Sequence, residues 1–383
     1  MKIESTFNVE DFRAAAKARI PGFAFDYFDG GAEGETCLAR NRTALEAIRL
    51  VPRYPADISS RSLKRTFLGR EWACPFGVAP MGLTGVGRSD TDISLARAAA
   101  KAGIPYVLST VATTTIETIT RAAPGHVWFQ LYVTRDRSIC DDLLKRAAAC
   151  DVDVLVVTTD TQIPSRRERD MRNGFSLPLR LDARSVLSML RHPAWCIDKL
   201  VHGAPRLRNI APYLPPGTGA GPIAAFIASQ IDQRFDWNDI AQLRAQWKGK
   251  LVIKGVLSAS DAERAVAIGA DAVVVSNHGG RALDASPATI EALPQVVAAS
   301  GGKLEVLIDS GIRRGEDIAR AIALGARAAL VGRAVLFAAS AFGQDGADRA
   351  VTTLRDQFDR TLGMLGCNSP AEIGRDALFA PSR

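Results

Sequence analysis

The feature that most constrains the fold of this chain is a series of short, branched apolar segments that alternate with amphipathic, alanine-rich stretches. Eight of these apolar segments are predicted to be strands, at residues 76–80, 106–110, 127–132, 153–160, 250–255, 272–279, 305–311 and 328–333. Apolar strands that alternate with helices are typical of a parallel sheet covered by helices on both faces. The pattern therefore predicts an α/β protein.

The stretches between the strands carry helix boundaries and repeat a common unit. Residues 89–103 and 258–270 each open with Ser, Thr or Asp, which cap helices, and reach a glycine near their end. The segment AVAIGADAVVV, from Ala265, recurs as AIALGARAALV from Ala321. Eight such units predict a closed (β/α)8 TIM barrel, whose active site belongs at the carboxyl ends of the strands. The alternative is a doubly wound open sheet, but no GxGxxG motif follows the first strand.

Two regions fall outside the repeat within what is expected to be a single domain, 1–383. Residues 1–70 are predicted to form a helical lead-in, and residues 177–220 a long insertion, rich in Pro and Gly, between strands four and five. Between residues 161 and 210 there are ten basic residues and four acidic ones, an excess that would favour an anionic surface. No run reaches the ~18 apolar residues that a membrane-spanning helix requires, so any membrane contact is expected to be peripheral.

Composition excludes several other classes of protein. A hydrophobic content of 47% supports a globular core. The amino terminus has early acidic residues and no continuous apolar core, which argues against a secretory signal and for a cytoplasmic location. The six cysteines lack CxxC spacing, so neither a metal site nor a disulfide framework is expected. The net charge of +7 is modest, and no nucleic-acid partner is expected.

Polar residues close four consecutive strands, and in a barrel they would face a common mouth. They are Gln130 and Tyr132, Thr158 and Asp160, Lys254, and Ser276 and His278. We predict that His278 takes a proton and that Arg281, three residues later, holds a carboxylate. Asp160 could orient the imidazole and favour its protonated form. Lys254 has two interpretations, a Schiff-base nucleophile as in aldolases or a fixed cation beside an electron-rich cofactor.

The last two predicted strands are followed by a different set of residues, in which glycines and arginines occur together. The residues are Asp309, Gly311, Arg313 and Arg314 after strand seven, then Gly332 and Arg333 after strand eight. Glycines let backbone amides approach an anion, and arginine matches the oxygens of phosphate. These strands are where barrels commonly bind phosphate.

With these residues, the chain resembles the FMN-dependent 2-hydroxy acid dehydrogenases and oxidases, the family that includes mandelate and flavin-linked lactate dehydrogenases. The resemblance rests on SNHGGRALD, DSGIRRGED, VGR and FDYFDGGAE, and it extends over nearly the whole chain. It implies FMN as the cofactor, oxidation of a small (S)-2-hydroxy acid to the 2-oxo acid, and a homotetramer.

The resemblance also implies roles for individual residues. The catalytic residues would be His278, Asp160, Tyr132 and Lys254. The substrate would contact Tyr27, Tyr132, Arg167 and Arg281. FMN would contact Pro80, Met81, Gly82, Ser109, Gln130, Thr158, Lys254, Ser276, Asp309, Gly311, Arg313, Gly332 and Arg333. Carbanion formation and hydride transfer both require the same set.

Departures from the oxidase pattern bear on the electron acceptor and the substrate. Gly82 stands where the oxidases usually have alanine, which favours a dehydrogenase that passes electrons to a quinone or another external acceptor. Val111 stands where glycolate oxidase has tryptophan, which favours a larger, mandelate-like or lactate-like substrate. The 177–220 insertion is similar to that of mandelate dehydrogenase, which implies peripheral contact with the inner face of the cell membrane.

Three alternatives remain open. The first is an oxidase that reduces oxygen to hydrogen peroxide. The second is a phosphate-binding barrel lyase or isomerase that uses Lys254 covalently. The third is a non-catalytic, membrane-associated barrel.

Overall fold

Eight parallel strands form a closed barrel in the computed structural model, which describes residues 2–174, 183–214, 226 and 229–379. The barrel order is β10-β3-β4-β5-β6-β7-β8-β9. Its strands are β3 (Phe76–Val78), β4 (Tyr106–Ser109), β5 (Val127–Leu131), β6 (Val154–Thr158), β7 (Lys250–Val256), β8 (Ala272–Val275), β9 (Glu305–Ile308) and β10 (Ala328–Val331). The predicted TIM barrel is confirmed, and the alternative of an open sheet is wrong.

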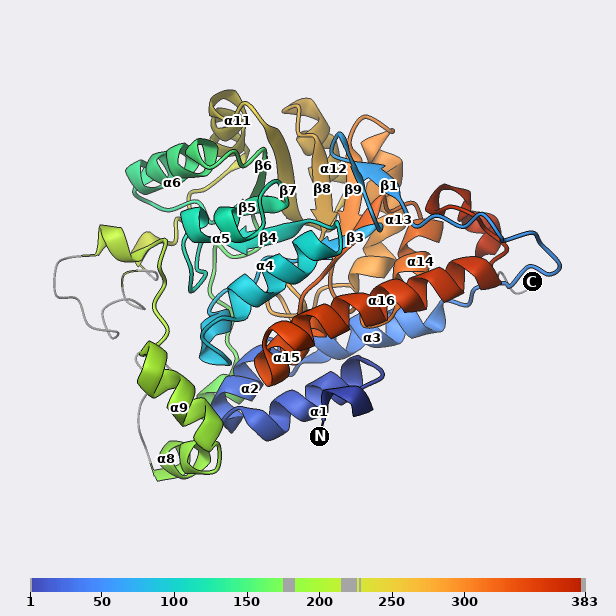
Figure 1. Ribbon diagram of the computed structural model, residues 1–383. Helices are drawn as coiled ribbons and strands as arrows, with labels where there is room; N and C mark the ends of the chain where they lie inside the picture. Colours follow the sequence, from blue (N-terminus) through green and yellow to red (C-terminus); the bar gives the residue numbers. More distant parts are fainter. Residues whose placement is uncertain (1, 175–182, 215–225, 227–228, 380–383) are drawn as a thin grey trace.

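Helices cover the outside of the barrel (Figure 1). They are α4 (Thr91–Lys101), α5 (Ile116–Ala122), α6 (Arg137–Ala149), α11 (Trp237–Gln246), α12 (Ala259–Ala267), α13 (Thr289–Ser300), α14 (Gly315–Ala323), α15 (Arg333–Phe342) and α16 (Gln344–Met364). The expected caps are present on α12, where the Ser258 hydroxyl accepts from the Asp261 amide at 3.1 Å. Gly269, after this helix, has a φ of 73°, which suits glycine.

All the strands except β7, which extends to Val256, end before their predicted segments because the polar residues at their carboxyl ends leave the ladder. β6 pairs with β7 from Val154 to Thr158, so Asp160 lies beyond the last pair. On β7 the register shifts after Lys254, where Gly255 has a φ of 111°. These residues therefore sit on the loops that form the rim of the barrel.

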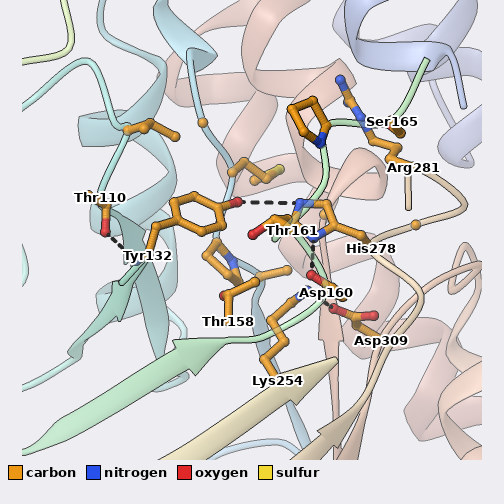
Figure 2. A pocket seen from close by; sticks show the side chains of 18 of the residues that line it. Thr110, Tyr132, Thr158, Asp160, Thr161, Ser165, Lys254, His278, Arg281 and Asp309 are labelled. Carbon is orange, nitrogen blue, oxygen red and sulfur yellow. Dashed lines mark hydrogen bonds and ion pairs between the residues drawn. The ribbon is translucent and has the colours of Figure 1, made fainter. Parts of the chain in front are cut away.

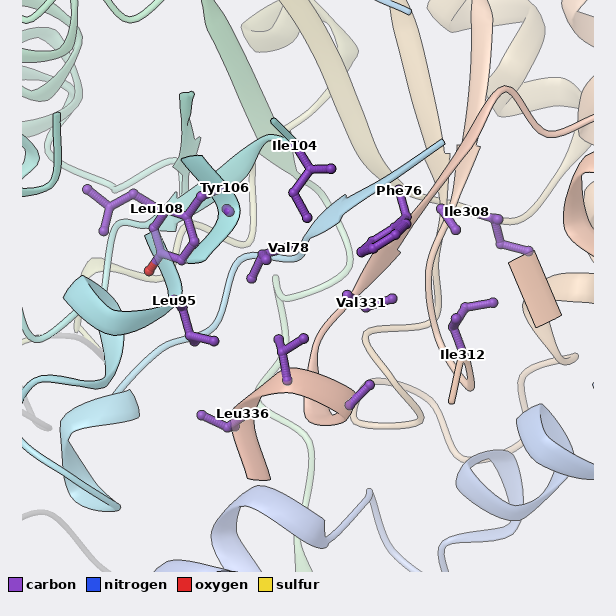
Figure 3. Packing of buried hydrophobic residues seen from close by; sticks show 14 of the residues in the cluster. Phe76, Val78, Leu95, Ile104, Tyr106, Leu108, Ile308, Ile312, Val331 and Leu336 are labelled. Carbon is purple, nitrogen blue, oxygen red and sulfur yellow. The ribbon is translucent and has the colours of Figure 1, made fainter. Parts of the chain in front are cut away.

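The barrel has two apolar layers. The outer layer lies between strands and helices, where residues such as Phe76, Leu95 and Leu336 pack together (Figure 3). The inner layer contains small and branched side chains from alternate strand positions, with three aromatic residues, Phe67, Trp72 and Trp128. Phe67 and Trp72 belong to a hairpin of β1 (Arg65–Phe67) and β2 (Arg70–Trp72). Their rings lie 6.1 and 6.2 Å from the ring of Trp128, both edge-on, and close the amino end of the barrel.

The lead-in is helical over only part of 1–70. A short 3-10 helix, η1 (Ile3–Ser5), precedes α1 (Val9–Arg19), α2 (Gly22–Asp29) and α3 (Thr36–Ala47), and α1 and α2 lie at the end of the molecule opposite β1 (Figure 1). Residues 48–64 contain no helix, and the hairpin β1–β2 follows. Pro52 and Pro55 lie in this stretch and lack the amide hydrogen that a helix interior needs.

The insertion follows β6 and contains short helices. α7 (Glu168–Arg172) precedes the predicted insertion, and the described part of the insertion contains α8 (Ala183–Leu190), α9 (Pro193–His202) and η3 (Ala211–Tyr213). Residues 177–182 and 215–220 of the predicted insertion lie outside the described residues. Within the described ranges, every helix is either too short or too polar to span a bilayer.

Helix α9 projects from the body of the molecule but is fastened to the barrel at its base (Figure 1). The indole of Trp195 donates to the carbonyl of Val86 at 2.8 Å, and Lys199 donates to the carbonyl of Gly85 at 2.6 Å. The Asp198 carboxylate accepts from the hydroxyl of Ser89 at 2.8 Å. The carbonyls belong to η2 (Thr84–Val86), in the loop between β3 and α4.

Candidate active site

A cavity of about 390 Å³ lies at the carboxyl ends of the barrel strands. Its lining includes sixteen of the predicted site residues: Tyr27, Pro80, Met81, Gly82, Tyr132, Thr158, Asp160, Arg167, Lys254, His278, Arg281, Asp309, Gly311, Arg313, Gly332 and Arg333. The other three, Ser109, Gln130 and Ser276, are buried behind the wall. The structure thus gathers residues from every part of the chain into one site.

His278 lies between a carboxylate and a phenol (Figure 2). Its Nδ1 is 2.8 Å from Oδ1 of Asp160, and its Nε2 is 3.4 Å from the hydroxyl of Tyr132. Because a carboxylate only accepts hydrogen bonds, Nδ1 carries a hydrogen, and Nε2 of the neutral ring presents its lone pair to the cavity. This arrangement orients the imidazole as a base.

The backbone after β8 is left-handed over three consecutive residues of the motif NHGG. His278, Gly279 and Gly280 have φ values of 58°, 68° and 74°. A Cβ on Gly279 would lie 2.7 Å from Nη1 of Arg333, and one on Gly280 would lie 2.7 Å from the backbone of Leu38. The positive φ favours glycine at both positions, and at Gly280 the backbone of Leu38 also leaves no room for a Cβ; the resulting turn brings Arg281 back to the cavity.

Lys254 is buried between two carboxylates. Its Nζ lies 3.3 Å from Oδ2 of Asp309 and 4.0 Å from Oδ2 of Asp160, and it donates to the hydroxyl of Ser276 at 2.9 Å. Burial alone would lower the pKa of Lys254, but Asp309 and Asp160 outweigh it and the pKa is raised. A Schiff base needs a neutral amine, so the geometry favours the interpretation of Lys254 as a fixed cation.

The pKa of Asp160 moves in the opposite direction. Burial alone would raise the pKa of this carboxyl, but the charges of His278 and Lys254 outweigh burial and lower it. Asp160 therefore stays ionised. A proton that arrives on His278 would be stabilised by this carboxylate.

Two guanidinium groups share the ring of Tyr27 on the side of the cavity beyond His278. The Cζ atoms of Arg281 and Arg167 lie 4.8 and 5.1 Å from its centroid. Nη1 of Arg167 is buried and forms no hydrogen bond among the described residues, although Oδ2 of Asp170 lies 3.2 Å away as its ion-pair partner. Burial raises the pKa of Tyr132, so its phenol remains a proton donor. Such donors suit a carboxylate ligand.

The opposite wall fits a flat, polar ring. The loop Pro80–Gly82 lines the cavity, and a Cβ on Gly82 would lie 2.5 Å from Cγ2 of Val111. The oxygen of the Gln130 amide accepts from the hydroxyl of Ser109 at 2.9 Å. Its nitrogen is buried and has no partner among the described residues. A heteroaromatic ring with acceptor atoms would satisfy that donor.

The glycine-rich end fits a phosphate. Arg313 lines the cavity, and its guanidinium donates to the carbonyl of Ile312 at 2.9 Å rather than to a carboxylate of the described residues. Burial and the nearby Arg42 lower the pKa of Arg313, as expected for a cation that lacks a counter-ion. Gly311 has a φ of 85° and packs against the carbonyl of Asn41, where a Cβ would lie at 2.7 Å. Together with the flat wall, this end accommodates the predicted FMN.

Arg333 has a structural role that the sequence did not reveal. Its guanidinium donates to the carbonyls of Phe28, Gly279 and Gly30 at 2.7, 2.8 and 2.7 Å. Three of its five N–H groups therefore join the lead-in to the loop after β8, and two remain for a ligand. Nothing near Arg333 in the sequence indicates these partners, because they lie far away along the chain.

Asp170 was also missed by sequence reasoning. It lies on α7, behind Arg167, with Oδ2 at 3.2 Å from Nη1 of that arginine. The only signal for this contact is the spacing of three residues, which places two side chains on one face of a helix. Elsewhere, the described residues contain no group of three or more His, Cys, Asp or Glu side chains arranged to hold a metal ion.

Comparison with known proteins connects this geometry with a family. Residues 16–380 match the model of the FMN-dependent dehydrogenases. The chain is 42% identical to (S)-mandelate dehydrogenase from Pseudomonas putida, over 98% of this chain and 94% of that protein. It is 40% identical to an L-lactate dehydrogenase from Caulobacter sp. (strain K31), over 97% and 98% of the two chains. A crystal structure of the monotopic membrane protein (S)-mandelate dehydrogenase superimposes with a TM-score of 0.94 at 42% identity, covering 98% and 99% of the two chains. A mandelate oxidase variant with (S)-mandelic acid superimposes with a TM-score of 0.81 at 34% identity, covering 98% of each chain.

Proposed function

Because the chain belongs to the family of FMN-dependent dehydrogenases, we propose that it uses FMN to oxidise an (S)-2-hydroxy acid to the 2-oxo acid. One observation carries the proposal: the imidazole of His278, oriented by Asp160 and Tyr132, and the guanidinium groups of Arg281 and Arg167 line the same cavity. A base and a carboxylate-binding group in one cavity are what removal of a proton from a 2-hydroxy acid requires.

Each polar group has a role in this proposal. Arg281 and Arg167, with Tyr27 between them, hold the substrate carboxylate. His278 receives the proton that leaves the substrate, and Asp160 stabilises the imidazolium. Tyr132 donates a hydrogen bond to the substrate. FMN, when bound, accepts the two electrons that the substrate carbon loses.

The chain also has residues suited to hold the cofactor. Pro80, Met81 and Gly82, with Ser109, Gln130 and Thr158, would contact the flavin ring. Lys254, supported by Ser276, would place a fixed positive charge beside it. Asp309, Gly311, Arg313, Gly332 and Arg333 would surround the phosphate-bearing chain.

The substrate side chain is proposed to be apolar and mandelate-like or lactate-like. Much of the remaining lining is hydrocarbon, contributed by Val111, Val133, Ile163, Ile210 and Phe235. A hydrocarbon side chain would bury its surface against this wall and gain about 25 cal/mol for each Å² removed from water. The similarity to a mandelate dehydrogenase and to lactate dehydrogenases supports both substrates.

The electrons are proposed to leave for a quinone or another external acceptor at the inner face of the cell membrane. Helices α8 and α9 expose apolar side chains that include Leu190, Ile197 and Leu200, 71%, 60% and 84% exposed. Exposed apolar helix faces beside basic residues are typical of proteins that lie on a membrane surface. The similarity to a monotopic membrane protein supports this proposal. A homotetramer is proposed from the family resemblance alone.

Anaerobic titration of the purified, yellow protein with a panel of 2-hydroxy acids tests the function. We expect (S)-mandelate or (S)-lactate to bleach the flavin, and slow recolouring when air is admitted. Recolouring at the rate of turnover, with hydrogen peroxide, would instead establish an oxidase. A flavin that no 2-hydroxy acid bleaches, or a borohydride-trapped substrate adduct on Lys254, would overturn the proposal.

A further inference from the structure

Asp170 is a buried carboxylate that lies against the cavity without lining it. It is 7% exposed, and its Oδ2 lies 3.2 Å from Nη1 of Arg167. The next charged neighbour, Arg169, faces away and is matched by its own carboxylates, Asp29 and Glu35. Asp170 is therefore the counter-ion of the cavity-lining guanidinium rather than of the surface network.

Two like charges lie against the ring of Tyr27, and Asp170 interacts electrostatically with both. Arg167 and Arg281 approach the ring to 5.1 and 4.8 Å. Burial, and next Arg167, lower the pKa of Arg281. Burial raises the pKa of Asp170, while Arg167 and then Arg281 act to lower it. The three groups thus form one electrostatic unit, with two positive charges and one negative charge.

We propose that Asp170 is a specificity-determining residue, which sets the net charge of this unit to +1 and so selects 2-hydroxy acids with one carboxylate and an uncharged side chain. One carboxylate makes the unit neutral, which a buried site requires. A second carboxylate would be buried without a partner. The inference rests on the proposed function and names the substrate class of the same site.

The rest of the cavity offers no cation for a second carboxylate. Among the described lining residues, Lys254 is paired with Asp309, while Arg313 and Arg333 lie at the glycine-rich end. The protonated form of His278 would be paired with Asp160. Much of the other lining is hydrocarbon, and it also includes Asp232, an acid that is paired with Arg137.

A charge series on the flavin-loaded protein tests the inference, with (S)-lactate and (S)-malate as probes. Malate is lactate with one added carboxylate, so the ratio of their half-saturating concentrations in anaerobic flavin reduction measures selectivity. Asp170→Asn raises the net charge of this three-group unit to +2. We expect this variant to shift the ratio towards malate on the order of tenfold. The limiting rate with lactate should change much less, because His278 and Asp160 are untouched.

Glu168→Gln is the matched control, because it removes the same charge from the same helix at a side chain that is 36% exposed and paired with Arg172. Solvent screens that charge, so the ratio should stay at the wild-type value. An unchanged ratio in Asp170→Asn, or an equal shift in Glu168→Gln, would overturn the inference.

A second comparison tests the effect of charge in the absence of Arg167. Arg167→Gln lowers the net charge of the three-group unit to zero. The double variant Arg167→Gln/Asp170→Asn restores that net charge to +1. The double variant should therefore need about tenfold less lactate than the single Arg167 variant. If it needs as much or more, Asp170 does not act through charge. Failure of the proposed function is distinct, since then no 2-hydroxy acid would reduce the wild-type flavin.

Discussion

The two ends of the barrel differ in the side chains that form them: aromatic rings at the amino end and charged groups at the carboxyl end. The amino end is closed by the buried rings of Phe67, Trp72 and Trp128, with Phe67 and Trp72 each edge-on to Trp128. The carboxyl end is open and held by ion pairs, with His278 in a left-handed conformation. The same strands therefore carry residues that stabilise the fold at one end and the candidate catalytic residues at the other. Substitutions at the two ends should affect different measurements.

The largest effect is expected from His278→Gln at the open end. The variant should retain yellow flavin, while anaerobic flavin reduction by substrate slows by about 10²- to 10⁴-fold, the contribution of one positioned base. Stopped-flow absorbance measures the rate, and the thermal midpoint serves as the control for folding. Reduction at the wild-type rate would remove His278 from the mechanism.

Phe67→Ala tests the closed end. Loss of a buried aromatic ring should lower the free energy of unfolding by about 3–5 kcal/mol, because the cavity left behind cannot collapse fully. Denaturant unfolding measures this change. Flavin reduction at low temperature should stay within roughly twofold of wild type; a loss comparable to that of His278→Gln would show that the two ends are not independent.

Arg281→Met should weaken substrate binding more than the chemical step. Loss of charged hydrogen bonds to the carboxylate should raise the half-saturating substrate concentration roughly 10- to 100-fold. The exposed Arg314→Met is the matched control and should leave it unchanged. Equal substrate dependence in the two variants would exclude Arg281 from carboxylate binding.

The smallest effect concerns acid stability at the open end. Because the pKa of Asp160 is lowered in the folded protein, its ionised form stabilises the fold above the unfolded-state pKa, about 3.9. This contribution is lost as the pH falls through the folded-state pKa. Asp160→Asn removes it, so urea unfolding of the variant should lose less stability with acid than wild type between about pH 5 and pH 2. Parallel curves for the two proteins would contradict the assignment.

The open end was more predictable from the sequence than the closed end, for a physical reason. Strand ends such as those at Asp160 and His278 are local signals, and barrel closure brings them together. The hairpin at Phe67 and Trp72 is too short to show a periodicity, and its role depends on contact with Trp128. The carbonyl partners of Arg333, and the position of Asp170 behind Arg167, depend likewise on tertiary contacts. Tyr27 was indicated by resemblance alone, and the structure places it between two guanidinium groups.

The attachment of α9 has a consequence for how the molecule is oriented. Trp195 donates a hydrogen bond to the carbonyl of Val86, and Lys199 donates one to the carbonyl of Gly85. Both carbonyls lie only a few residues beyond Gly82, which is part of the cavity wall. A surface that binds the exposed apolar faces of α8 and α9 would therefore also fix the orientation of the cavity mouth relative to that surface. If α8 and α9 bind a membrane as proposed, their attachment to the barrel sets the direction in which the cavity opens.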